Sequence, residues 1–129
     1  MTEKRKTAVL LVDDEAEFAS TLAERLNLRG YSAFVDPDGE KALERLARPD
    51  TDCVDLVLLD VKLPGMDGIE VLRRIKALQA ALPVILLTGQ AGARDGIEGM
   101  KLGAAGYLSK PVDLQELLDL FASLGVGHA

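Results

Sequence analysis

The chain has 129 residues, a formal net charge of −6 and a single cysteine. This length fits one ordinary domain, and one cysteine cannot form a disulfide within the chain. The acidic charge argues against nonspecific binding to nucleic acid or to anionic membranes, so we expect neither as a direct partner. The apolar run after the charged N-terminus is too short for a signal peptide, and no segment reaches the length of a membrane span, which predicts a soluble cytoplasmic protein.

Short apolar runs alternate with amphipathic segments along the whole chain. The runs predict strands and the amphipathic segments predict helices; Phe18, Leu22 and Leu26, for example, form the apolar face of the first helix. Glycines 92, 96 and 99 lie in or beside the fourth helix, and each interior glycine costs about 1 kcal/mol relative to alanine, so this helix is predicted to be the weakest. The expected strands are residues 7–12, 31–35, 54–60, 84–87 and 105–108, and the expected helices are residues 15–28, 40–47, 67–79, 93–102 and 114–124.

This alternation predicts an α/β fold with a doubly wound, five-stranded parallel sheet. Crossovers between parallel strands are right-handed, and helices must cover both faces of such a sheet. The pattern alone does not give the strand order. We expect a single domain over residues 1–129, with its core at about residues 8–124 and tails at residues 1–6 and 125–129.

Polar side chains follow four of the predicted strands. Asp13 and Asp14 come after the first strand, Asp60 ends the third, Thr88 follows the fourth and Lys110 follows the fifth. Because parallel strands point the same way, these ends converge on one edge of the sheet. Carboxylates without histidine or cysteine suit Mg²⁺, with Mn²⁺ as a substitute. A carboxylate can also act as a nucleophile and form an aspartyl phosphate, with the metal and the lysine offsetting phosphoryl charge.

These residues, in this order and spacing, resemble the receiver domain of two-component response regulators, which belong to the CheY-like family. The resemblance covers about residues 8–124 and implies a flavodoxin-like fold with strand order 2-1-3-4-5. One departure is Gly106, where the family often has an acidic residue, and we expect it to loosen the last strand. The motifs that carry the resemblance are Asp13-Asp14, Asp60, Pro64-Gly65-Met66-Asp67-Gly68, Thr88, Tyr107 and Lys110-Pro111.

The resemblance implies a role for each matching residue. Asp60 would be the phosphoacceptor. Asp14 would bind Mg²⁺ directly, Asp13 directly or through water, and the backbone carbonyl of Lys62 would complete the protein ligands together with Asp60. Further roles are phosphoryl contact by Thr88 and Lys110, a conformational switch by Thr88 and Tyr107, tuning of phosphoryl loss by Lys62 and Gln90, and a cis peptide bond at Lys110-Pro111.

The implied function is a phosphorylation-operated switch rather than an enzyme with its own substrate. The phosphoryl group would come from a sensor histidine kinase or a histidine phosphotransfer protein. The surface of the fourth helix, fifth strand and fifth helix would change, and a homodimer through that surface is possible.

Two other functions fit parts of the pattern. A haloacid-dehalogenase-like phosphatase also uses an aspartate after a strand, but it needs a second acid where this chain has Lys62. A binding module that is never phosphorylated would keep the fold without using the site. Taken one at a time, the residues also have structural explanations, since Asp13 and Asp14 could cap a helix and Tyr107 could simply pack.

Overall fold

The computed structural model describes residues 6–48, 54–89 and 93–126. The turnover role expected of Gln90 falls outside the described residues.

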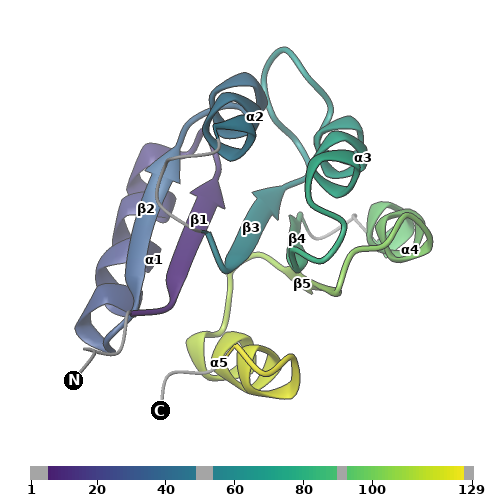
Figure 1. The fold of residues 1–129 in the computed structure, drawn as a ribbon. Helices are drawn as coiled ribbons and strands as arrows, with labels where there is room; N and C mark the ends of the chain where they lie inside the picture. The colour runs from purple at the N-terminus through teal and green to yellow at the C-terminus, as the bar shows by residue number, and fades with distance from the viewer. Residues whose placement is uncertain (1–5, 49–53, 90–92, 127–129) are drawn as a thin grey trace.

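Five parallel strands form the sheet, in the order β2-β1-β3-β4-β5 (Figure 1). This confirms the predicted doubly wound fold and its strand order, and each predicted boundary lies within two residues of the observed one. The strands are β1 (Ala8–Val12), β2 (Ser32–Asp36), β3 (Leu56–Asp60), β4 (Val84–Thr88) and β5 (Gly106–Ser109). The helices are α1 (Ala16–Leu28), α2 (Gly39–Ala47), α3 (Gly68–Leu78), α4 (Ala93–Lys101) and α5 (Leu114–Ser123).

Helices cover both faces of the sheet and divide the core into two layers. Helices α1 and α5 pack on one face, where Leu26 and Phe121 are fully buried, and α2 and α3 pack on the other, where Leu72 and Ile75 are fully buried. Figure 1 shows α1 and α5 on the side of the sheet away from α2 and α3. Every residue of β1, β3 and β4 is buried, as expected for the central strands of a sheet covered on both faces.

Aspartates begin three of the helices. The side chains of Asp38, Asp67 and the predicted cap Asp113 each accept a hydrogen bond from a backbone N–H in the first turn, 2.9 to 3.1 Å away. Such caps satisfy N–H groups that have no partner within the helix. They fix where each helix leaves the sheet edge.

Glycines let α4 and β5 approach their neighbours closely. A Cβ atom at Gly96 would lie 2.5 to 2.7 Å from the ring of Tyr107, and one at Gly99 would overlap the side chain of Leu86. Gly106 is buried at the start of β5, where a Cβ would come within 3.1 Å of Leu120. Its small size therefore allows α5 to pack against β5.

Candidate functional site

The carboxyl ends of the strands bring together the side chains that the sequence singled out. Asp13 directly follows β1, Asp60 is the last residue of β3, Thr88 is the last residue of β4, and Lys110 directly follows β5. The backbone N–H of Lys110 donates to the carbonyl of Thr88 over 2.7 Å, which ties the lysine to the end of β4. The site is thus assembled from strands that are far apart in sequence.

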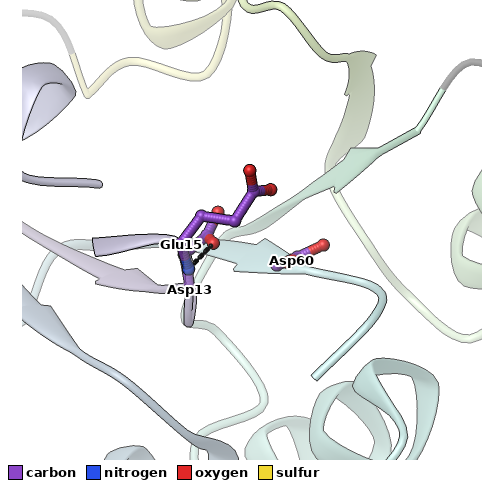
Figure 2. A group of neighbouring side chains, drawn as sticks. All are labelled: Asp13, Glu15 and Asp60. Carbon is purple, nitrogen blue, oxygen red and sulfur yellow. Dashed lines mark hydrogen bonds between the residues drawn. The ribbon is translucent and has the colours of Figure 1, made fainter. Parts of the chain in front are cut away.

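Three carboxylates gather at this edge. Oxygens of Asp13, Glu15 and Asp60 lie within 4.8 Å of one another, and Figure 2 shows the three side chains close together at the ends of the strands. Backbone groups fix two of them: the N–H of Glu15 donates to Asp13 Oδ1 over 2.9 Å, and the N–H of Lys62 donates to Asp60 Oδ1 over 3.1 Å. At an effective dielectric of 20, two like charges at this separation repel by about 3 to 4 kcal/mol.

Lys110 provides the opposite charge. Its Nζ lies 2.7 Å from Glu15 Oε1, 2.9 Å from Asp13 Oδ2 and 3.4 Å from Asp60 Oδ2. The same atom lies 4.5 Å from the centre of the Phe18 ring, over its face. One ammonium against three carboxylates leaves the group with two uncompensated negative charges.

Burial sets the acidity of Asp60. Desolvation raises the pKa of its carboxyl group above the ordinary 3.8, and the nearby Asp13 raises it further. The Lys62 N–H and the charge of Lys110 pull in the opposite direction without outweighing the burial. For Lys110, burial favours the neutral amine, but the hydrogen bond to Glu15, the close contact with Asp13 and the charges of Asp13 and Asp60 outweigh it and raise its pKa.

The site fits a hard divalent cation. Asp13 Oδ2 is fully buried and, among the described residues, receives no hydrogen bond of normal geometry, although it lies in the ion pair with Lys110. The Lys110 ammonium compensates this oxygen only in part, because Glu15 and Asp60 share the same cation. The available ligands are carboxylate oxygens, which Mg²⁺ prefers, and an ion of charge +2 would balance the two negative charges that remain.

The other predicted site residues differ in burial and in their distance from the carboxylate cluster. Asp14 is exposed and lies outside the group of three carboxylates, where Glu15 stands instead. Thr88 is buried and its hydroxyl donates to the carbonyl of Leu108 over 3.5 Å. The side chain of Lys62 is exposed.

Two further predicted features, an aromatic residue and a proline peptide bond, lie on β5 and directly after it. Tyr107 is 37% exposed and its ring lies against Gly96 of α4. The Lys110-Pro111 peptide bond is cis.

Sequence reasoning missed Glu15 and the position of Phe18 beside Lys110. The run Asp13-Asp14-Glu15 contains the acidic signal, but the sequence pattern predicts Glu15 only as the first residue of a helix. It is the residue before α1, and its side chain turns toward a lysine 95 positions away.

The model of the response regulator receiver domain matches residues 9–122 of the chain. A relative from Klebsiella pneumoniae, the transcriptional regulatory protein CpxR, is 42% identical over 110 residues, which make up 85% of this chain and 45% of that protein. The non-phosphorylated HemR receiver domain from Leptospira biflexa is 35% identical with a TM-score of 0.81, covering 96% of this chain and 97% of that one. A response regulator from Burkholderia pseudomallei, solved with a phosphorylated aspartic acid, a calcium ion and citrate, is 27% identical with a TM-score of 0.80, covering 92% of this chain and 69% of that one.

The chain therefore belongs to the response regulator receiver domain family of two-component systems, as the resemblance implied. Accepting a phosphoryl group is the general role of this family, and its members bind Mg²⁺ at an acidic pocket of the kind found here. Receiver domains are generally not enzymes with a separate substrate.

The expectation that excluded nucleic acid from the partners is wrong for proteins of this class. Curated relatives are named as transcriptional regulatory proteins, and the chain spans about half of their length. The charge of −6 describes these 129 residues, so it does not decide what a regulator of this kind acts on.

None of the helices in the described part of the chain has both the length and the apolar character needed to cross a bilayer.

Proposed function

We propose that Asp60 accepts a phosphoryl group from the phosphohistidine of a histidine kinase. The observation that carries this proposal is the ion pair between Lys110 Nζ and Asp60 Oδ2, 3.4 Å apart, at the edge of a buried acidic cluster. A carboxylate and an ammonium group this close together can address the same phosphoryl group, which supports the proposal. The phosphorylated aspartate of the Burkholderia pseudomallei relative supports the same chemistry.

The transfer is a substitution at phosphorus. A carboxylate oxygen of Asp60 attacks, a new O–P bond forms, and the P–N bond breaks with its electron pair returning to the imidazole, which takes up a proton from solvent. Lys110 neutralises charge on the phosphoryl oxygens, and the Thr88 hydroxyl donates a hydrogen bond to one of them. Water later attacks the same phosphorus, releasing inorganic phosphate and restoring the carboxylate.

Asp13, Asp14, Asp60 and the carbonyl of Lys62 are the proposed ligands of Mg²⁺, and Glu15 lies close enough to contribute through water. When bound, the ion neutralises negative charge on the carboxylates and on the incoming phosphoryl group. The support for this assignment is that three clustered carboxylates share the single positive charge of Lys110.

The proposed response to phosphorylation involves Thr88 and Tyr107. The Thr88 hydroxyl holds only a 3.5 Å contact to Leu108, so reorienting toward a phosphoryl oxygen costs little. Movement of Thr88 would open space for the partly exposed ring of Tyr107, which now lies against Gly96. The surface of α4, β5 and α5 would change with it. A phosphoryl group can shift this equilibrium only by as much as it favours one arrangement over the other.

Labelling with a small phosphodonor tests the proposal. Wild-type protein incubated with acetyl phosphate and Mg²⁺ should gain the mass of one phosphoryl group, in an acid-stable, base-labile linkage typical of an acyl phosphate. Asp60→Asn should gain none, whereas Asp113→Asn, which changes an exposed carboxylate at a helix cap, should be labelled like the wild type. Labelling that persists in Asp60→Asn would overturn the assignment.

A further inference from the structure

We infer that Phe18 is a positioning residue for Lys110 in phosphoryl transfer: the face of its ring seats the ammonium group next to Asp60. This inference rests on the proposed function. The observation that supports it most directly is the 4.5 Å distance from Lys110 Nζ to the centre of the Phe18 ring. A cation within about 6 Å over an aromatic face is attracted by the ring quadrupole, and the attraction is stronger where water is excluded.

The fold places Phe18 for this task. The residue lies in the first turn of α1, directly after the acidic end of β1, and is half-buried against the core layer beneath α1 and α5. Only 16% of the Lys110 side chain is exposed, so its ammonium group is held mostly by protein groups. Phe18 thus packs against the core while the face of its ring lies against Lys110.

The ring differs from the other three contacts of Lys110 in carrying no charge. Asp13, Glu15 and Asp60 all attract the ammonium, but the same carboxylates are the groups that a divalent cation and a phosphoryl group would engage. When their charge is taken up in this way, their hold on Lys110 weakens. Phe18 holds the amine independently of that charge, so it keeps Lys110 at the site during transfer.

The test compares variants that keep or remove the ring. Phe18→Leu preserves an apolar side chain without the quadrupole, and it should lower the maximal rate of labelling by acetyl phosphate about three- to tenfold. The acetyl phosphate concentration at half-maximal rate should change little, because the lost contact acts on charge in the transition state. Phe18→Tyr, which keeps the aromatic face, should restore most of the rate.

Phe34→Leu is the matched control. Phe34 lies on β2, is partly buried, and has its own cation contact, with Arg45 at 4.8 Å. The substitution removes a similar contact away from the site, so the labelling rate should remain at the wild-type level. A merely structural effect of replacing a phenylalanine would slow both leucine variants.

Nuclear magnetic resonance supplies a readout that does not depend on phosphorylation. Protons over the face of an aromatic ring are shielded, so the ε-methylene protons of Lys110 should resonate upfield in wild type and Phe18→Tyr and return to ordinary positions in Phe18→Leu. A wild type that is never labelled at Asp60 would overturn the proposed function. A wild type that is labelled, with Phe18→Leu matching it in both rate and lysine shift, would overturn the role of Phe18.

Discussion

Gly68→Ala should damage both the fold and the site. Gly68 opens α3, and a Cβ there would lie 2.5 Å from the carbonyl oxygen of Val61, with the carbonyl oxygen of Asp60 and the Cα of Val61 both 2.6 Å away. The closest of these is 0.9 Å short of the 3.4 Å at which ordinary contact begins. All three are backbone atoms, so no side-chain rotation relieves the overlap and the end of β3 must move with Asp60.

Overpacking of this kind costs about 1 to 3 kcal/mol, and the rigid surroundings place Gly68→Ala near the top of that range. The better helix propensity of alanine returns at most about 1 kcal/mol. We expect a net loss of about 2 to 3 kcal/mol in the free energy of unfolding, or about 10 °C in Tm for a domain of this size. Urea titration measures the loss, and labelling at Asp60 should fall in parallel.

Gly89→Ala is the control for this experiment. A Cβ at Gly89 would meet nothing within 4 Å, so the substitution should stay within about 0.5 kcal/mol of wild type. If Gly68→Ala proves as stable as Gly89→Ala and is labelled normally, the close contact between the start of α3 and the end of β3 does not exist as described.

Three further substitutions test other parts of the structure. Burial raises the pKa of Asp60, so the stability gained from its neutral carboxyl is complete below pH 3.8 and is lost as pH rises through the folded pKa. Without metal, Asp60→Asn should therefore melt a few degrees above wild type at pH 7 and at the same temperature as wild type in acid. Added Mg²⁺ should stabilise the wild type and not the variant. Arg45→Ala removes the guanidinium that donates two hydrogen bonds to the buried Asp36, 2.8 and 3.0 Å long, and should lower the free energy of urea unfolding by about 1 to 3 kcal/mol. Arg45→Lys should be intermediate, because an ammonium group cannot form both bonds in this geometry. Equal stability of wild type and both variants would contradict the pairing. Phe121→Ala empties a fully buried position and should cost about 3 to 5 kcal/mol by the same assay, and a loss below 1 kcal/mol would count against the layer beneath α5.

Much of the fold could be predicted because its signals are local. Apolar runs of five or so residues ending in turn residues mark the strands, and caps such as Asp113 mark where helices begin. The convergence of Asp13, Asp60 and Lys110 also follows, since parallel strands end at one edge. The strand order came only from the resemblance, because the hydrophobic pattern says that a strand is buried and not which strands flank it.

The remaining features depend on contacts between distant residues. The pattern put Phe18 on the apolar face of its helix, which is correct, but only the packed structure brings Lys110 over its ring. Similarly, the glycines of α4 were interpreted as a weakness of the helix. Gly96 and Gly99 also give room to Tyr107 and Leu86, a complementarity of shape that helix propensity does not record.

The order of the site residues along the chain has a consequence for synthesis on the ribosome. The acids Asp13, Glu15 and Asp60 are all translated before Lys110, the base that contacts all three. Until β5 docks, the acids at the sheet edge lack this counter-ion. Docking of β5 brings Lys110 to them and so relieves their repulsion. Electrostatics thus favours completion of the sheet by its last strand, so the groups that make the domain chemically competent also help it to close.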